Sequence, residues 1–464
     1  MRRLVSPRLL VAASALAYAV GFAALSVQRH RAFETGRFDL GNMVQAVWAT
    51  AHGHPLRVTD LHGHQVSRLA AHVDPILVLF APLWWAWPSP EMLLVLQAVA
   101  VAAGAFPVFS LARRHLGSER AALGFALAYL LLPATQWLTL NEFHPVALAC
   151  PLLLFAFDEL DRGRLWRFAV FAVFAAATKE EIALVVAGFG VWYALSRRRR
   201  ALGAAIVAAG ALWFGIAVGV VVPHFDHDGT SSFYSRYRDV GGTPGGVLRT
   251  AATHPLRILD KAFGERSLHY LADLAVPLAG LFVAAPLVLV AALPELGLNL
   301  LSSTKTQTSI HFHYTAGLIP PLVVGTVLGA ARLARASPRR AVALAAVVVA
   351  AALVENVRLG AMFRAPASVS RHDRIAARAL RVVPADAVVS ATNTLGAHLS
   401  ARRRILSFPR LEDATWLAVD ETRLSYGDRS SGGKRAAGAL ARIRRDPRWR
   451  VVYERGGVLI LRRS

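Results

Sequence analysis

The chain has 464 residues, of which 55% are apolar and only 17% are charged. This balance excludes an ordinary soluble enzyme, because the apolar residues gather into runs of roughly 17–25 that can cross a hydrocarbon core as helices. The formal charge of +23 would suggest nucleic acid for a soluble protein, but here the basic residues lie between apolar runs, where membrane topology explains them. We therefore predict a mainly α-helical, polytopic membrane protein that contacts membrane lipids and no nucleic acid.

Taken in chain order, the apolar runs predict about eleven spans. The first run follows the basic segment MRRLVSPR, but it exceeds the apolar core of a signal peptide and lacks a cleavage site, so we read it as retained. The segment 268–301 is short for two crossings and holds three prolines, which predicts a hairpin of broken helices. The spans are expected near 9–27, 90–112, 120–138, 144–160, 165–178, 181–196, 201–222, twice within 268–301, and near 313–333 and 340–357.

Lysine and arginine fill alternate short loops, which by the positive-inside rule places the N-terminus in the cytoplasm of a bacterium, at its plasma (inner) membrane. These loops are MRR, ARRHLGSER, DRGRLWR, SRRRR and RLARASPRR. The extracytoplasmic face then receives most of the histidines and loop carboxylates, in the segments 28–89, NEFHP, TKEE, 223–267 and STKTQTSIHFHY.

The last hundred residues have a different character, and we divide the chain into a transmembrane domain, 1–364, and a small soluble extracytoplasmic α/β domain, 365–464. AVVSA, ILSFP and TWLAVD alternate with helical segments, and WRVVYER and GVLILRR predict a hairpin over Gly456 and Gly457. The domain carries 20 Lys and Arg against 9 Asp and Glu. Its arginines, Arg402–Arg404 among them, are candidates to attract an anionic envelope polymer.

The outer loop 28–89 is too long for a simple connector and contains two amphipathic pieces, which we expect to be interfacial helices. In FDLGNMVQAVWATAHG the apolar residues recur at helical spacing. Asp39 stands where it could act as the N-cap of that helix, or as a reactive carboxylate at the membrane surface. The second piece places His72 and Asp74 before a tryptophan-rich segment that suits a membrane boundary. Asp39 and Asp74 would then flank one cavity.

A resemblance to a known family rests on several short motifs in a fixed order. These are FDLG after the first span, HVDP before APLWW, NEFHP at 141–145, Lys179-Glu180-Glu181 at the start of a span, and the C-terminal HLSARRRILSFPR. Together they resemble the bacterial membrane-protein family called domain of unknown function 2079. That family is similar to the GT-C glycosyltransferases, which take a sugar from a polyprenyl-phosphate donor outside the cytoplasm. The sequence has Asp74 where this family often has serine.

The resemblance implies a sugar transfer to an envelope glycan or lipid acceptor, and such a transfer needs particular groups. A carboxylate must take the acceptor proton, and cationic or hydrogen-bonding groups must hold the departing phosphate. Asp39 is the candidate base, with Asp74 as a second catalytic carboxylate. Candidate substrate-binding residues are His72, Glu142, His144, Lys179, Glu180, Glu181, His311 and His313.

Each candidate has a structural alternative. Lys179, Glu180 and Glu181 could be an ion-pair cluster at a helix start, although charges at a span boundary indicate function by default. Glu142 and His144 could simply form a polar turn. The histidines of 52–72 and of HFDHD at 224–228 leave a divalent metal open, but their spacing matches no zinc motif and a solvated loop explains them. No cofactor is certain.

Two other classes of function stay open. A transporter or flippase of a lipid-linked molecule would also need a charged cavity, but it should carry polar residues near the midplane and repeated halves. A non-catalytic envelope assembly protein would need Asp39 only as a cap. No nucleotide or hydrolase motif is present, which argues against chemistry driven by ATP within this chain.

Overall fold

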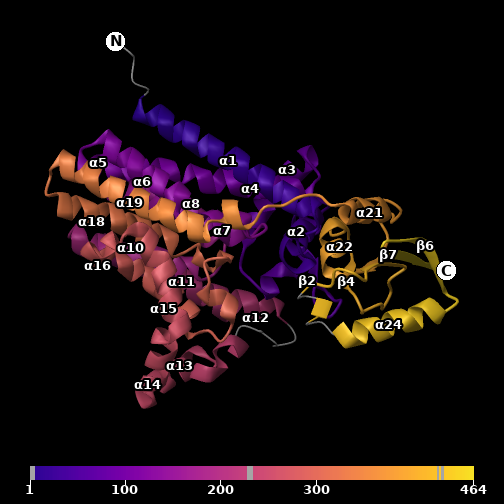
Figure 1. The fold of residues 1–464 in the computed structure, drawn as a ribbon. Helices are drawn as coiled ribbons and strands as arrows, with labels where there is room; N and C mark the ends of the chain where they lie inside the picture. Colours follow the sequence, from indigo (N-terminus) through magenta and orange to yellow (C-terminus); the bar gives the residue numbers. More distant parts are fainter. Residues whose placement is uncertain (1–5, 227–233, 426–427, 430–432) are drawn as a thin grey trace, which may run out of the picture.

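A computed structural model describes residues 6–226, 234–425, 428–429 and 433–464. These residues form a bundle of apolar helices with a small α/β domain at one end (Figure 1). The predicted fold class, a helical polytopic membrane protein with a small C-terminal sheet domain, is thereby confirmed. The segments MRR and part of HFDHD lie outside the described residues.

Within the described ranges, four helices are long and apolar enough to cross a membrane, and a fifth forms if α6 (Glu119–Leu131) and α7 (Pro133–Leu140) count as one span bent by 47°. The four are α1 (Pro7–Arg31), α4 (Pro90–Ala103) with α5 (Ala105–Leu116), α11 (Arg200–Ile216) with α12 (Val222–Phe225), and α19 (Pro338–Leu359) with α20 (Ala361–Arg364). The other apolar runs hold shorter helices: α8 (Ala149–Asp161), α9 (Leu165–Ala176), α10 (Ile182–Ser196) and α18 (Ile319–Ala334). The count of eleven spans stays a prediction.

Serine caps mark where several of these helices begin. Ser6, Ser89 and Ser337 each accept a hydrogen bond from a backbone N–H in the first turn, and each precedes a proline. Proline suits this place because its missing N–H would have no partner in a helix anyway. The Ser-Pro pairs are thus the local signals that start three of the longest apolar helices.

The segment 268–301 reverses direction, as a hairpin requires. After α15 (Glu265–Ala275), Ala279 and Gly280 adopt left-handed backbone conformations, and the chain returns through α16 (Pro286–Leu289) and α17 (Leu293–Leu301). The turn lies beside α18, where the Arg332 Nη1 donates to the Ala284 carbonyl at 2.7 Å. The reversal therefore sits at the basic end of α18, while the number of crossings stays a prediction.

Three of the predicted basic loops, ARRHLGSER, DRGRLWR and SRRRR, meet at one end of the bundle. Arg8 forms an ion pair with Glu119 at 3.3 Å. The Asp161 carboxylate lies 2.8 Å from Arg114 and 3.0 Å from His115, and it also pairs with Arg197. Asp39 and the other candidate site residues occupy the opposite end, beside the C-terminal domain. The grouping agrees with the positive-inside assignment, and the orientation itself remains a prediction.

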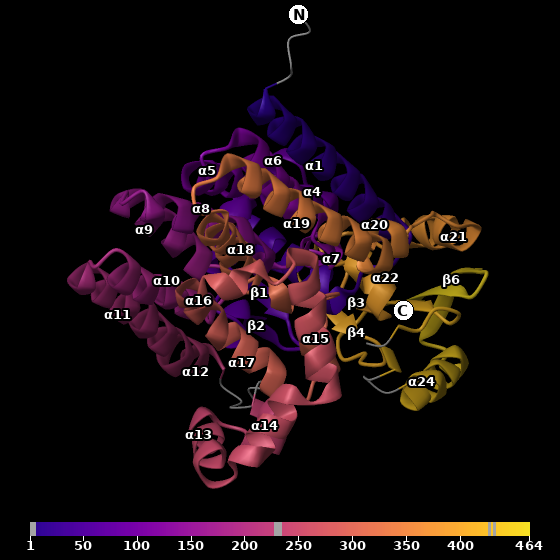
Figure 2. The same cartoon turned by 60° about the vertical axis from the view of Figure 1, so that its left-hand side comes forward.

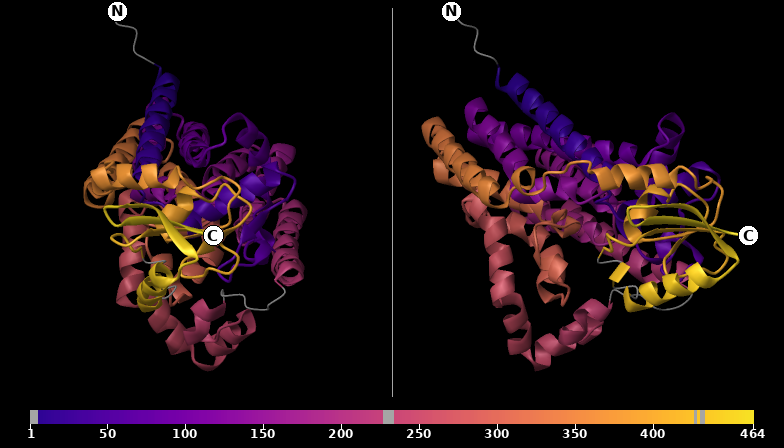
Figure 3. Two further views of the ribbon diagram at one scale, coloured as in Figure 1. Left: turned by 90° about the vertical axis from the view of Figure 1, so that its right-hand side faces the viewer. Right: turned by 45° about the vertical axis from the view of Figure 1, so that its right-hand side comes forward.

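The C-terminal domain contains a five-stranded mixed sheet in the order β4-β3-β5-β7-β6. Its strands β3 (Val389–Ala391), β4 (Ile405–Ser407) and β5 (Trp416–Asp420) are parallel, while β6 (Trp449–Arg455) and β7 (Val458–Arg463) form the predicted antiparallel hairpin. The helices α21 (Arg371–Leu380), α22 (Asn393–His398) and α24 (Gly433–Arg445) pack around the sheet (Figure 3). The predicted strands are confirmed, and the boundary at 364 stays a prediction.

The structure corrects one expectation about this domain. Arg402 is only 4% exposed and donates to the backbone carbonyls of Leu399, Pro384 and Ala387. A buried guanidinium that is hydrogen-bonded to three backbone carbonyls of its own domain does not face an envelope polymer. The expectation that Arg402 helps to attract such a polymer is therefore wrong, because a run of three arginines does not reveal which of them points inward.

The first outer loop packs against both domains. It comprises α2 (Asn42–Ala51), the short antiparallel pair β1 (Arg57–Thr59) and β2 (Gln65–Ser67), a 3₁₀ segment (Pro75–Phe80) and α3 (Ala81–Ala86). The apolar face of α2 lies against the last two, in a small core that includes Val44 and Val47. Trp84 is buried there, whereas Trp85 and Trp87 are 69% and 42% exposed, which suits a membrane boundary.

Candidate functional site

Asp39 lies in a wide helical turn, Arg37–Gly41, directly before α2. The N-cap position of α2 is Gly41, and no side chain caps this helix. The Asp39 carboxylate instead points to His144, with 3.3 Å between Oδ1 and Nε2, and 53% of the side chain is exposed. The cap interpretation of Asp39 is therefore wrong, and the carboxylate is available for another task.

Glu142 holds the backbone of this turn from the bundle side. Its carboxylate accepts hydrogen bonds from the backbone N–H of Gly36 at 3.1 Å and of Leu40 at 2.9 Å. Burial, and next the charge of Asp39, raise the pKa of Glu142 to about 8, although these N–H groups oppose the shift. Because Glu142 binds the backbone both before and after Asp39, it fixes the direction in which the Asp39 carboxylate points.

His144 connects the turn to two other motifs. Its Nδ1 lies 2.7 Å from the Asn141 carbonyl oxygen, and its ring stacks on His313 with centroids 3.9 Å apart. The Asn141 side-chain oxygen accepts from the His313 backbone N–H at 3.0 Å. Because a carbonyl oxygen only accepts, Nδ1 of His144 carries a proton and Nε2 is the nitrogen that faces Asp39. The motifs NEFHP, SIHFHY and FDLG thus meet at one place.

The charges around Asp39 favour its ionised form. Burial raises the pKa of Asp39. The hydrogen bond and charge of His144, together with the charge of Arg68, lower this pKa by more than burial raises it, so the net shift is downward. Half of the Asp39 side chain is exposed, so burial disfavours its charge less than these two partners favour it. Asp39 is therefore an ionised carboxylate at neutral pH and can accept a proton.

The C-terminal domain forms the other side of the turn. Arg37, 1% exposed, donates to the Ser407 hydroxyl at 2.8 Å and to the carbonyls of Ile405 at 2.7 Å and Thr59 at 2.9 Å. A Cβ on Gly36 would meet the side-chain amide nitrogen of Asn393 at 2.7 Å, so any larger residue there would force this amide to move. The turn that carries Asp39 is thus clamped between Glu142 and α22.

The second motif of the outer loop brings a cation to this place. The Arg68 Nε donates to Asp74 at 2.7 Å, and Asp74 is 1% exposed. Glu180 accepts from the Val73 backbone N–H at 2.9 Å and lies 3.1 Å from Nδ1 of His72. Burial raises the pKa of Asp74 to about 6, with Arg68 opposing the shift. Asp74 and Glu180 therefore fix the loop that presents Arg68 to Asp39.

Further cations come from the start of α10 and from the loop before α13. Lys179 forms an ion pair with Glu181 and lies 5.8 Å from the centre of the Tyr314 ring. The Arg236 Nη1 lies 3.5 Å from the Tyr314 hydroxyl. Burial, and then the charges of His144, Lys179, His72 and Arg236, lower the pKa of His313 well below its ordinary value. His313 is therefore a neutral ring among positive groups.

His311 lies in a different environment from His313. Its Nδ1 is 2.9 Å from the Ser309 hydroxyl, and its ring meets Trp137 edge to face at 4.6 Å. Burial lowers the pKa of His311; the charge of Asp273 opposes this shift and the charge of Arg364 adds to it. The structure thus brings together Asp39, His72, Asp74, Glu142, His144, Lys179, Glu180, Glu181 and His313 but directs His311 elsewhere.

Four residues of this arrangement were missed at the level of sequence: Arg68, Asn141, Arg236 and Tyr314. Asn141 and Tyr314 adjoin motifs that had been noticed, so their position next to Glu142 and His313 was an available signal. Arg68 and Arg236 stand in loops that contain other charged residues, and nothing in the local pattern distinguishes them.

The histidines of the first outer loop do not gather at a metal site. Across the part of the chain that is described, no group of three or more His, Cys, Asp or Glu side chains could hold a metal ion. His52 stacks on Trp48, His62 lies 3.4 Å from a nitrogen of Arg410, and His64 lies 3.7 Å from Asp60. HFDHD is not covered by this statement, since it extends beyond Asp226.

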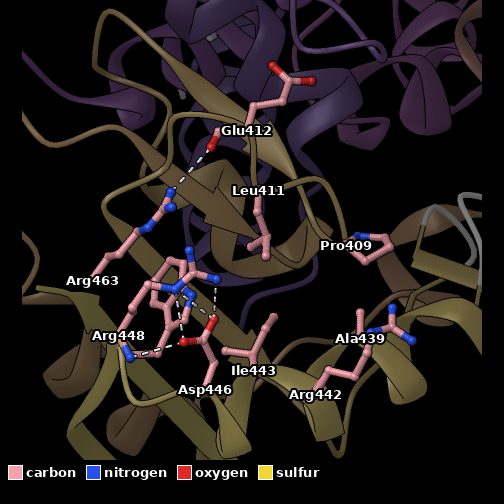
Figure 4. A pocket seen from close by; sticks show the side chains of 10 residues that line it. Pro409, Leu411, Glu412, Ala439, Arg442, Ile443, Asp446, Arg448 and Arg463 are labelled. Carbon is pink, nitrogen blue, oxygen red and sulfur yellow. Dashed lines mark hydrogen bonds and ion pairs between the residues drawn. The ribbon is translucent and has the colours of Figure 1, made fainter.

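A separate cleft of about 410 Å³ lies on the C-terminal domain, between α24 and the segment 409–412 (Figure 4). Two of its arginines have internal partners: Arg448 bonds to Asp446 at 2.8 Å, and Arg463 lies 3.5 Å from the Glu412 carbonyl. None of the predicted site residues lines this cleft. It is therefore not part of the candidate site around Asp39.

Comparisons with known proteins agree with this architecture. The model of a family described as "Predicted membrane protein (DUF2079)" matches residues 29–460. The chain belongs to this family. The match spans FDLG, NEFHP and the C-terminal sheet, so one family accounts for both domains. No curated protein matches the chain.

Two solved structures share the fold. ArnT from Cupriavidus metallidurans bound to undecaprenyl phosphate aligns with a TM-score of 0.59 at 13% identity, over 98% of this chain and 97% of that one. The same protein in its apo state aligns with a TM-score of 0.56 at the same identity and coverage. At this identity the likeness shows the fold alone. Both resemblances, to the family and to the GT-C fold, are confirmed.

Proposed function

We propose that the protein is a GT-C-type glycosyltransferase that moves a sugar from a polyprenyl-phosphate donor to an envelope acceptor at the extracytoplasmic face. The observation that carries the proposal is the position of Asp39. Its carboxylate caps no helix, is half exposed, faces His144 and lies within the influence of the Arg68 charge. The shared fold with a protein crystallised with undecaprenyl phosphate supports the class of donor.

In this reaction the acceptor hydroxyl oxygen bonds to the anomeric carbon of the sugar, and the bond from that carbon to the donor phosphate oxygen breaks. The bonding electron pair leaves with the polyprenyl phosphate, and Asp39 takes the hydroxyl proton. Positive groups beside the leaving phosphate stabilise its growing charge. Arg68, Lys179 and Arg236 supply that charge, with Tyr314 and His313 beside them.

The remaining candidates position these groups. We assign Asp74 the orientation of Arg68 rather than proton transfer, because its carboxylate is buried and bonded to that guanidinium. Glu181 orients Lys179, Glu180 and His72 fix the HVDP loop, and Glu142 fixes the turn of Asp39. Arg68 donates to Asp74 through Nε, and among the described residues no other hydrogen bond of its side chain is seen. Its terminal nitrogens can therefore point to a phosphate.

The test separates donor binding from transfer. Asp39→Asn keeps the size of the side chain but removes the proton acceptor, so we expect a loss of about 10²–10⁴ in transfer rate with unchanged binding. Arg68→Met should instead weaken binding. The binding probe is undecaprenyl phosphate added to purified protein in nanodiscs and detected by native mass spectrometry.

Transfer is read in a deletion strain by lipid and glycan profiling after rescue with each variant. Glu34→Gln is the matched control, because Glu34 lies on the same loop and pairs at 3.1 Å with Arg29 rather than with a candidate site residue. The control should restore the wild-type profile. Restoration by Asp39→Asn would refute the assignment of Asp39 as the base.

A further inference from the structure

The chain between α12 and α15 leaves the bundle as two short helices, α13 (Pro244–Thr253) and α14 (Pro255–Phe263), which we call the arm. Figure 2 shows the arm projecting away from the other helices. No side chain of α14 is fully buried. Helices of this length are marginal in water without tertiary packing, so the arm needs a surface to cover it.

The arm exposes a continuous apolar face. Leu256, Leu259 and Phe263 recur at spacings of three and four residues, so they line one side of α14, and they are 73%, 48% and 59% exposed. Leu248 on α13 adds a side chain that is 72% exposed. Arg257 and Lys261 lie on the other side of α14, whereas Asp260, four residues after Leu256, borders the apolar face. Apolar patches of this kind mark interaction surfaces.

Charge and connection indicate what covers this face. The arm carries Arg249, Arg257 and Lys261 against the single carboxylate of Asp260. The chain enters it from the apolar helix Arg200–Phe225, whose central window is only 11% buried by protein, and leaves it towards the apolar hairpin of α16 and α17. The arm is therefore tethered at both ends beside the bilayer. Amphipathic helices with basic polar faces bind anionic membrane surfaces.

We propose that the arm lies on the bilayer surface nearest Asp39, with Leu248, Leu256, Leu259 and Phe263 among the lipid chains. Its arginines then lie beside anionic headgroups. The partner is the lipid surface itself, and this inference does not depend on the proposed reaction.

Docking of the arm also fixes part of the candidate site. Lys261 on α14 bonds to Asp239 at 2.9 Å, and Ser303 bonds to the same carboxylate at 2.6 Å. The Ser303 backbone N–H donates to the Arg236 carbonyl at 2.8 Å. The lipid-bound arm therefore holds the segment that places Arg236 beside Tyr314.

The test compares two positions on the same helix in the full-length protein. Cys150 is the single cysteine and is buried, so a Cys150→Ala background accepts one new label at a time. Leu256→Cys places an environment-sensitive dye on the apolar face, and Arg257→Cys, one residue further along the same helix, places it on the polar face as the matched control. The protein is reconstituted in phosphatidylglycerol–phosphatidylcholine nanodiscs that carry a nitroxide at the upper end of the acyl chains.

We expect the dye at 256 to be quenched at least about threefold more than the dye at 257. Leu248→Cys gives the same measurement on α13 and should match 256. Equal quenching at 256 and 257 would overturn the proposal. Disulfide crosslinking of 256 to a second copy of the chain, with no quenching by lipid, would also overturn it, because a protein partner would then cover the face.

The basic residues give a second measurement. Replacing Arg249 and Arg257 by glutamine should lower quenching at 256 in phosphatidylglycerol nanodiscs and leave it unchanged in pure phosphatidylcholine nanodiscs. A decrease of equal size in both lipids would refute the role of anionic headgroups.

Discussion

The C-terminal domain and the arm both leave the helical bundle near Asp39, yet they attach to it in opposite ways. The domain buries polar side chains at its contact: Arg37 and Gln45 are each 1% exposed, and Gln45 donates to the carbonyls of Arg402 and Arg403. The arm leaves Leu256 73% exposed and reaches the site through the exposed pair of Lys261 and Asp239. One contact is closed to water, and the other is open.

The difference teaches where fixed geometry comes from in this protein. A buried hydrogen bond must be made in full, since an unpaired group left behind costs about 1–3 kcal/mol. An exposed ion pair contributes about 1 kcal/mol or less. The C-terminal domain is therefore firmly fixed against the Asp39 turn. Substitutions at its contact with the first outer loop should lower stability far more than substitutions in the arm.

The largest effect is expected at Arg37. Arg37→Met removes donors to three acceptors, two of which are buried carbonyls, and should lower the stability of domain docking by about 3 kcal/mol. Arg37→Lys keeps the charge but cannot bridge all three, so an intermediate loss is expected. Thermal unfolding in detergent and limited proteolysis near 365–370 measure both.

Arg29→Met is the control for this change. Arg29 pairs with Glu34 at 3.1 Å in a partly exposed contact, and its removal should cost less than about 1 kcal/mol. If Arg37→Met and Arg29→Met shift the unfolding midpoint equally, the domain is not held by Arg37.

A second prediction concerns the close approach at Gly36. The backbone there is extended, with φ of −114°, so alanine is allowed by conformation, but its Cβ would meet the amide nitrogen of Asn393 at 2.7 Å. Gly36→Ala should cost about 1 kcal/mol, at the lower end of the range for overpacking, because the Asn393 amide can move but then loses its contact with the Phe38 N–H. Asn393→Ala in the same chain removes the obstructing amide and should recover part of the loss, as a double-mutant cycle by thermal unfolding would show.

Gly21→Ala is the matched substitution elsewhere, because no heavy atom lies within 4 Å of the added Cβ. It should leave the unfolding midpoint unchanged or raise it slightly, because Gly21 lies inside α1 and alanine favours a helix by about 1 kcal/mol over glycine. Full additivity of Gly36→Ala and Asn393→Ala would contradict the contact between the turn and α22.

The third prediction is a dependence on pH that comes from Glu142. Its folded pKa of about 8 exceeds the ordinary value of 4.5, so the folded protein keeps this proton where the unfolded chain loses it. The contribution to stability is fully present below about pH 4.5 and is lost as the pH rises towards 8. The unfolding midpoint should therefore fall across this window.

Two variants isolate this contribution. Glu142→Gln has no proton to lose but retains an acceptor for the Leu40 N–H, so its midpoint should stay flat across the same window. Glu142→Ala leaves the N–H groups of Gly36 and Leu40 without this partner and should be less stable at every pH. A wild-type slope in Glu142→Gln would show that another group titrates.

These residues also show what the sequence could reveal. The apolar runs gave the helical bundle because a bilayer imposes length and composition on every span. The strands of the C-terminal domain followed from alternation and from the Gly456-Gly457 turn. Glu142 was noticed through its motif, but not its role, since a left-handed residue that binds a backbone 106 positions away leaves no local pattern.

The site was predictable where its parts were rare and unpredictable where they were common. An aspartate after the first span and histidines at span starts are conspicuous, and the structure brings Asp39, His144 and His313 together. Arg37 and Arg68 are two arginines among many, and only the folded contacts show that one holds the domain and the other faces Asp39. Burial of a charge is a tertiary property, which local sequence does not encode.

The smallest effect on stability is expected at Lys261. Lys261→Met breaks the bond to Asp239, whose side chain is 56% exposed, so thermal unfolding should change by less than about 1 kcal/mol. The local effect should be larger than the global one, because Asp239 also holds Ser303 and thereby the Arg236 carbonyl. Hydrogen exchange in nanodiscs should therefore speed up at the Ser303 amide while the amides of Gly36 and Leu40, bound by Glu142, stay protected. Equal acceleration at both places would mean that the arm and the C-terminal domain move as one unit, and the contrast between a closed and an open contact would fail.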